Sequence, residues 1–339
     1  MRKPRILGRR ETNYYHLMSR VVNRDYIFGD EEKEFFRRTM RRLEAFMGVR
    51  VLTYAIMSNH WHILLEVPPM TELSDDELHR RIKAFYSKQR ANVIMQEYER
   101  VTAYAQQTGN SAWLDEWREK YTSRMGDLSI FVKELKERFS KWYNRKNNRK
   151  GTLWEERFKS VLVENSDHVI ATMATYIELN PVRAGLVEDP RDYRFCGYAE
   201  AVAGGAEARK GIEQILHMHG QQASWRKLAA QYRIHLFCTG EETSERPGVN
   251  PEKMQQVIEA GGELSTYELM RCRVRYFNDG VALGSKLFIE EVFEQHRSWF
   301  GEKRKSGARK IRGSGLEDLF SMRDLRLGAI SPPGLASLG

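Results

Sequence analysis

Two histidines separated by one residue are the first feature of this sequence that could do chemistry. His60 and His62 follow the pair Ser58-Asn59, whose side chains commonly close turns through hydrogen bonds to the backbone. The apolar stretches on either side of this pair predict a β-hairpin whose second strand carries both histidines. Because side chains alternate along a strand, both imidazoles would lie on one face of the sheet and Trp61 on the other.

Such a geometry can present two ring nitrogens to one metal ion, since neutral imidazole is a common metal ligand. A His-x-His pair on a strand is more often two half-exposed polar residues, so a third ligand must be found before the pattern indicates a metal site. His16 lies on a mostly apolar predicted strand, and we interpret it as a hydrogen-bonded core residue.

A second pair of candidate residues lies far along the chain, in a predicted helix. Tyr176 and Asn180 are four residues apart in a segment that starts near Ser166, a good helix cap, and stops at Pro181. Residues four apart lie above one another on a helix, so both side chains would share one face. Taken alone, Tyr176 would be interpreted as an aromatic residue packed on the core.

Composition describes a soluble globular chain. Of its 339 residues, 41% are hydrophobic and 30% are charged, which allows one large domain or two smaller ones. No apolar run approaches the ~20 residues of a membrane helix, and no signal peptide is visible. Three widely separated cysteines fit neither a disulfide framework nor a thiolate zinc site. We therefore expect a cytoplasmic protein without a membrane partner.

The formal net charge of +9 points to a polyanionic partner. Basic residues are concentrated in residues 1–24 and 128–160, on either side of the segment that carries His60 and His62. This distribution favours nucleic-acid binding over a solvated surface. Candidate DNA contacts in and near these segments are Arg20, Arg24, Lys141, Arg145, Arg157, Lys159 and Arg183.

The order of elements predicts an α+β fold. A strand near 14–22, a helix over 30–47 and the hairpin form half of a ferredoxin-like antiparallel sheet with helices packed on it. A helical insertion is expected at about 70–127. It is followed by a helix near 128–143, a basic turn over 144–151 and strands at 152–154 and 158–163.

The rest of the chain carries weaker signals. Residues 201–206 form a small-residue linker, and 201–327 make a mainly helical, basic C-terminal region of unknown role, with helices at 211–219, 225–232 and 285–299. Residues 328–339 are rich in Gly, Pro and Ser and are expected to be a disordered tail. The sequence thus predicts a first domain over residues 10–200.

Four strings of sequence occur in this first domain, in the order YHLMSR at 15–20, MSNHWH at 57–62, GTLWEERFKS at 151–160 and YIELNPVRAGLV at 176–187. Together they closely resemble the single-tyrosine HUH transposases of the insertion-sequence 200-like type, and most of all the branch of REP-associated tyrosine transposases. The resemblance implies the HUH fold and an enzyme of DNA transposition and recombination. Such an enzyme cleaves and rejoins single-stranded DNA at hairpins or REP-like repeats through a covalent 5′-phosphotyrosine.

The resemblance also implies which residues act. The two histidines of the HUH motif fall on His60 and His62, the third metal ligand on Asn180 and the nucleophile on Tyr176. Two imidazoles and one amide oxygen are neutral ligands that leave a divalent ion its full charge, which suits Mg²⁺ or Mn²⁺. The expected partner is single-stranded or hairpin DNA in a bacterial nucleoid, and the oligomeric state stays open between monomer and homodimer.

Two other functions stay open. A domesticated protein could bind DNA or RNA hairpins and regulate them without cutting. A metal-dependent nuclease could use water and leave no covalent adduct. The intact set of His60, His62, Tyr176 and Asn180 favours the transposase, because a binding protein has no need of all four.

Overall fold

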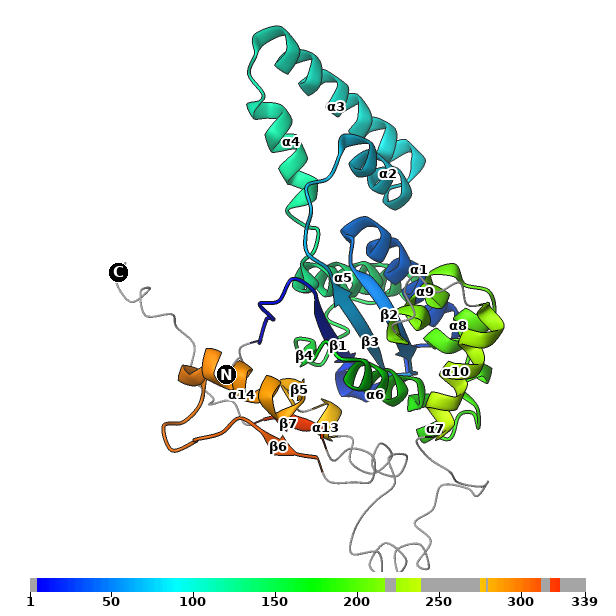
Figure 1. Ribbon diagram of the computed structural model, residues 1–339. Helices are drawn as coiled ribbons and strands as arrows, with labels where there is room; N and C mark the ends of the chain where they lie inside the picture. Colours follow the sequence, from blue (N-terminus) through cyan, green and yellow to red (C-terminus); the bar gives the residue numbers. More distant parts are fainter. Residues whose placement is uncertain (1–4, 217–223, 239–274, 279, 312–317, 324–339) are drawn as a thin grey trace, which may run out of the picture.

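The computed structural model describes residues 5–216, 224–238, 275–278, 280–311 and 318–323. A mixed sheet lies at its centre, with helices on both faces (Figure 1). The strands are β1 (Asn13–Arg20), β2 (Arg50–Ile56), β3 (His60–Val67), β4 (Lys159–Val163), β5 (Ala282–Gly284), β6 (Arg309–Lys310) and β7 (Phe320–Met322).

The helices of the first part are α1 (Asp30–Met47), α2 (Asp75–Phe85), α3 (Lys88–Thr108), α4 (Ala112–Thr122), α5 (Leu128–Lys146), α6 (Asp167–Glu178) and α7 (Asn180–Arg183). Those that follow are α8 (Gly197–Val202), α9 (Ala206–Ile215), α10 (Trp225–Cys238), α13 (Arg275–Asn278) and α14 (Lys286–Gln295). Short 3-10 turns are η1 (Val22–Arg24), η2 (Pro190–Asp192) and η3 (Arg297–Trp299). None of the described helices is long and apolar enough to cross a membrane.

Strand order in the sheet is β2-β3-β1-β4-β5-β7-β6. Within the first four strands every neighbouring pair is antiparallel. Strand β3 lies between β1 and β2, with α1 connecting those two, and this is the split βαβ arrangement of ferredoxin-like folds. The predicted α+β class with a ferredoxin-like antiparallel sheet is therefore confirmed.

Local sequence explains how α1 and the hairpin form. Three acidic residues lie in the first turn of α1, where they favour the positive end of the helix dipole. Gly48 ends the helix in a left-handed conformation with φ of 72°, which glycine adopts at little cost. The hairpin β2–β3 then pairs Ala55 with His62 and Ile56 with Trp61.

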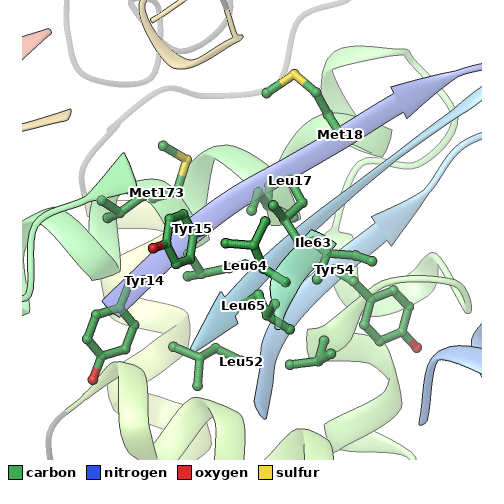
Figure 2. Close-up of a cluster of buried hydrophobic side chains, with 14 of the residues drawn as sticks. Tyr14, Tyr15, Leu17, Met18, Leu52, Tyr54, Ile63, Leu64, Leu65 and Met173 are labelled. Atoms are coloured by element: carbon green, nitrogen blue, oxygen red, sulfur yellow. The ribbon is translucent and has the colours of Figure 1, made fainter. Parts of the chain in front are cut away.

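The two faces of the sheet are covered by different helices. Trp61 is fully buried on one face, with its ring centroid 5.6 Å from that of Phe36 in α1, and α5 packs on α1 in the same layer. Helix α6 packs against β2, β3 and β4 from the other side. Figure 2 shows the buried side chains of β1, β2 and β3 together with Met173 of α6. His62 lies on the face that α6 covers, as the alternation predicted.

The segment between β3 and α5 is helical, as predicted. Helices α2, α3 and α4 extend away from the sheet (Figure 1). Ser74 and Ser87 cap α2 and α3 by accepting hydrogen bonds from Glu77 N and Arg90 N. None of the sequence motifs lies in this segment.

Three local predictions were wrong. Residues 201–206 are no linker, because Ala201 is fully buried in α8 and Ala206 begins α9. The basic segment 144–151 is not wholly a turn, since α5 continues through Lys146. Trp154 makes only an isolated bridge with Val21 rather than belonging to a strand. The predicted tail, residues 328–339, lies outside the described residues.

The C-terminal part contributes strands that the sequence did not predict. β5 pairs parallel with β4, β7 pairs antiparallel with β5, and β6 closes the edge of the same sheet. Each has three residues or fewer, which is too short for an alternating pattern to be recognised.

Gly211 in α9 is expected to be intolerant of substitution. A Cβ at this position would overlap the carbonyl oxygen of Leu52 in β2, which is backbone and cannot swing aside. We expect Gly211→Ala to lower the free energy of unfolding by about 1–3 kcal/mol, as overpacking does. Urea denaturation measures this, with Gly301→Ala as the control because no atom lies within 4 Å of its added Cβ. Equal effects of the two substitutions would contradict the close approach.

Candidate active site

The two histidines of β3 line a cleft of about 360 Å³. Their ring centroids are 5.1 Å apart, with the ring planes nearly perpendicular. His60 is half-buried at the end of the strand, whereas His62 lies deeper and is 3% exposed. The remaining lining side chains are Met18, Ser19, Arg20, Glu155, Glu156, Arg157, Lys159, Asn180, Arg183 and Asn278.

A side-chain amide fixes the hydrogen on the His60 ring. His60 Nδ1 lies 2.7 Å from Asn59 Oδ1, and Asn59 Nδ2 donates to the backbone carbonyl of Arg24 over 3.1 Å. Since a carbonyl only accepts, the amide NH₂ must face Arg24 and the amide oxygen must face the ring. His60 therefore carries its proton on Nδ1, which leaves the lone pair of Nε2 for a ligand.

His62 makes its hydrogen bond to another histidine. His62 Nδ1 lies 2.9 Å from His16 Nε2, and His16 Nδ1 lies 3.1 Å from the backbone oxygen of Phe277 in α13. His16 is fully buried and stacks on His62 with ring centroids 5.1 Å apart. The interpretation of His16 as a hydrogen-bonded core residue is confirmed, and its partner is one of the two motif histidines.

Tyr176 lies in the last turn of α6, against the same histidines. Its ring centroid is 5.9 Å from that of His62 and 5.7 Å from that of His16, both edge-on. The ring is fully buried and stacks on Phe277 at 4.7 Å. Its hydroxyl donates to Asn278 Oδ1 over 3.0 Å.

Asn180 begins α7, one helical turn after Tyr176, and is 2% exposed. Its amide NH₂ donates to the carbonyl oxygens of Tyr176 and Ile177, which directs Oδ1 away from the helix end. Arg183 donates to this oxygen over 2.6 Å, and its guanidinium lies 4.8 Å from the centre of the Tyr176 ring. An amide oxygen has two lone pairs, so one acceptor site is left beside the Arg183 bond.

Comparison with known proteins gives one match to a family model, in the first part of the chain. Residues 10–125 match the family model described as "Transposase IS200 like". Over these residues the chain is similar to IS200-like transposases. The match includes His60 and His62 and stops before Tyr176 and Asn180. No curated protein matches the chain.

A solved structure described as "Structure of the REP associates tyrosine transposase bound to a REP hairpin" is also similar to this chain. The two are 15% identical, the match covers 60% of this chain and 87% of that one, and the TM-score is 0.34. At this level the likeness identifies neither a ligand nor a site in this chain.

The side chains that line this cleft have the donor atoms to hold a divalent metal ion. Both histidines have Nδ1 engaged and Nε2 left over, and Asn180 Oδ1 is held facing away from its helix. In the part of the chain that the structure describes, no three His, Cys, Asp or Glu side chains form a ligand cluster. Asn180, which the resemblance implies as the third ligand, lines the same cleft as the two histidines.

Burial keeps the imidazoles neutral. Desolvation lowers the pKa of His60 to about 4 and that of His16 to about 3, with smaller effects from Arg20 and Arg183 on His60 and from Arg183 on His16. It also lowers the pKa of His62 well below its ordinary value of 6.5, assisted by His16 and His60. All three rings are neutral at neutral pH, which is the form that binds metal.

These pKa values predict acid sensitivity of the fold. An unfolded histidine has a pKa of about 6.5, so between pH 6.5 and 4 the unfolded chain binds more protons than the folded chain. The buried neutral histidines therefore make their full contribution to the free energy of unfolding above pH 6.5. This contribution falls as the pH drops through this window. Urea denaturation at several pH values should show the fall, and His60→Gln should show a smaller one. A His60→Gln variant with the wild-type pH dependence would contradict this origin.

The candidate DNA contacts divide into two groups. Arg20, Arg157, Lys159 and Arg183 line the cleft with the histidines. The other three do not line it. Arg24 lies in the turn beside Asn59, whereas Lys141 and Arg145 are exposed on α5, in the layer across the sheet from α6. Their part in DNA binding stays a prediction.

Three site residues were missed from the sequence. Asn59 was interpreted only as a turn former, although it also holds the His60 ring. Phe277 and Asn278 contact Tyr176 from α13, far along the chain. No local pattern marks these two residues, since only the fold brings them to the site. Glu178, two residues after the tyrosine, does not line the cleft and accepts hydrogen bonds from Thr53 and from Tyr198 N in the core.

Proposed function

We propose that this protein is a transposase that cleaves and rejoins single-stranded DNA, with Tyr176 as the nucleophile and a divalent ion held by His60, His62 and Asn180. The observation that carries the proposal is the position of the Tyr176 ring, 5.9 Å centroid to centroid from His62 beside a cleft lined by both histidines. The phenol is the proposed nucleophile because the Nε2 lone pairs of both histidines are assigned to the metal ion.

In the proposed step, the Tyr176 oxygen bonds to the scissile phosphorus and the 3′-oxygen of the preceding nucleotide leaves. The phenol gives up its proton to water, and the leaving oxygen takes one up. The divalent ion, when bound, stabilises charge on the phosphate oxygens. The product is a 5′-phosphotyrosine and a free 3′-hydroxyl, and attack by another 3′-hydroxyl reverses the step without an energy source.

The basic residues of the cleft provide the binding surface for the strand. Arg20, Arg157 and Lys159 line it together with His60, and their positive charge favours a phosphate backbone. Arg183 contacts both the Tyr176 ring and Asn180, so it connects the nucleophile with the proposed metal ligand. Hairpin DNA is the proposed substrate because the four sequence strings resemble those of the REP-associated branch.

The hydrogen bond from the Tyr176 hydroxyl to Asn278 should affect the rate of adduct formation. The Tyr176 hydroxyl donates a hydrogen bond to Asn278, and we expect this bond to open when the hydroxyl turns toward a phosphate. A hydrogen bond of this kind is worth about 0.5–1.5 kcal/mol, so Asn278→Ala should speed adduct formation about two- to tenfold. Single-turnover kinetics with excess enzyme measure this. A slower reaction would show that Asn278 assists the nucleophile instead of restraining it.

The proposal is tested with purified full-length protein, Mn²⁺ and single-stranded hairpin oligonucleotides labelled at the 3′ end. We expect an SDS-resistant adduct that retains the label, together with a shortened strand that ends in a 3′-hydroxyl. Cleavage without an adduct would replace the proposal with a nuclease that uses water. Tight hairpin binding without cleavage, in Mg²⁺ and in Mn²⁺, would favour the non-cutting regulatory protein.

A further inference from the structure

We propose that His16 is a positioning residue that sets the tautomer of His62 and takes its own orientation from the C-terminal part of the chain. This inference rests on the proposed function, in which His62 is a metal ligand. It concerns which ring nitrogen of His62 is free to bind the metal, and it assigns a role in the active site to residues beyond 201.

A backbone oxygen determines which ring nitrogen of His16 carries hydrogen. The carbonyl of Phe277 lies 3.1 Å from His16 Nδ1, across 261 residues of sequence. A carbonyl oxygen can only accept a hydrogen bond, so the proton of the neutral His16 ring must lie on Nδ1. His16 Nε2 then carries a lone pair and no hydrogen.

The tautomer of His16 determines the tautomer of His62. His16 Nε2 is 2.9 Å from His62 Nδ1, and with a lone pair on His16 the hydrogen between them must belong to His62. His62 is thereby fixed with its proton on Nδ1 and the lone pair of Nε2 available. The opposite tautomer would place a proton on Nε2 and would have to lose it before a metal could bind.

The tautomer of His60 is set in the same way. For His60 the acceptor is Asn59 Oδ1, and the amide is itself oriented by the carbonyl of Arg24. In both rings the lone pair of Nε2 is therefore left for a ligand. A backbone carbonyl determines where each proton lies, through the side chain of Asn59 for His60 and of His16 for His62. One carbonyl comes from the turn beside the hairpin and the other from α13.

Burial makes the His16 connection rigid. His16 is fully buried, between the stacked ring of His62 at 5.1 Å and the edge-on ring of Tyr176 at 5.7 Å. Partners that orient the ring of a metal-binding histidine typically contribute 10- to 100-fold in metal affinity. We expect a loss of about this size when the acceptor on His16 is removed.

The first test needs no substitution. Two-bond nitrogen–proton correlation spectra of metal-free, full-length protein labelled with [¹⁵N]histidine report which ring nitrogen carries hydrogen. We expect His62 with hydrogen on Nδ1 and a bare Nε2, and His16 with the same tautomer. Hydrogen on His62 Nε2 would overturn the proposal.

The second test measures Mn²⁺ affinity by calorimetry in matched variants. His16→Phe keeps a ring but has no acceptor and should raise the Kd for Mn²⁺ about 10- to 100-fold. His16→Gln keeps an acceptor oxygen and should raise it less. His168→Phe, on an exposed residue of α6, is the control and should leave the Kd unchanged. Wild-type affinity in His16→Phe, or equal losses in Phe and Gln, would contradict the role of the acceptor.

These measurements separate the two proposals. If no covalent adduct forms while the tautomer and the Mn²⁺ affinities behave as expected, strand transfer fails and the positioning role of His16 stands. If the adduct forms but His62 carries its hydrogen on Nε2, the reverse holds.

Discussion

Tyr176→Phe is expected to abolish the covalent adduct and to reduce strand cleavage at least about a thousandfold, as the loss of a nucleophile does in other covalent enzymes. The substitution removes one oxygen and leaves the ring to stack on Phe277. It also leaves Asn278 Oδ1 without the hydroxyl that donates to it, which costs about 1 kcal/mol of stability. Binding of DNA and of Mn²⁺ should stay close to wild type.

The measurement is a quantitative gel assay of adduct and cleaved strand, with thermal unfolding to establish that the variant is folded. Tyr104→Phe in α3 is a matched control, because it removes the same atom in the helical segment away from the site and should react like wild type. Adduct formation by Tyr176→Phe at a rate near wild type would show that another residue is the nucleophile.

His62→Ala is expected to have the second largest effect. It removes one of two imidazole ligands and should weaken Mn²⁺ binding by more than about 100-fold, since even partners one step removed from a metal contribute 10- to 100-fold. Adduct formation should fall with it. The substitution also leaves buried His16 Nε2 without its partner, which should cost about 1–3 kcal/mol of stability.

Calorimetry with Mn²⁺ and the gel assay measure the two effects on the same preparation. His168→Ala is the control, because this histidine is exposed in the first turn of α6 and does not line the cleft. If His62→Ala, once shown to be folded, bound Mn²⁺ as tightly as wild type, the proposed metal centre would be wrong.

Local patterns were sufficient where neighbouring residues determine the structure. The alternation along β3 correctly placed His60 and His62 on one face and Trp61 on the other, because a strand has a strict period of two. The caps and apolar spacing of α1 gave its range of Asp30–Met47. The four-residue spacing of Tyr176 and Asn180 predicted one face of a single helix, whereas α6 ends at Glu178 and Asn180 begins α7.

Contacts between distant segments could not be predicted. The hydrogen bond from His16 to Phe277 joins residues 261 apart, and no periodicity in either segment records it. Of the two- and three-residue strands, β5 pairs with the edge of β4, β7 pairs with β5 and β6 pairs with β7. Their own short sequences do not favour a strand. The contacts of Phe277 and Asn278 with Tyr176 could not be predicted for the same reason.

The most direct test of the account is to locate the covalent bond. The adduct formed with a short hairpin oligonucleotide is digested with nuclease and trypsin and sequenced by tandem mass spectrometry. Tyr176 is the one tyrosine of the tryptic peptide 160–183. We predict that the mass of the attached nucleotide is found on this residue. The modification should require Mn²⁺ or Mg²⁺ and should be absent from His62→Ala. A nucleotide attached to any other residue, or a cleaved strand with no modified peptide, would contradict it.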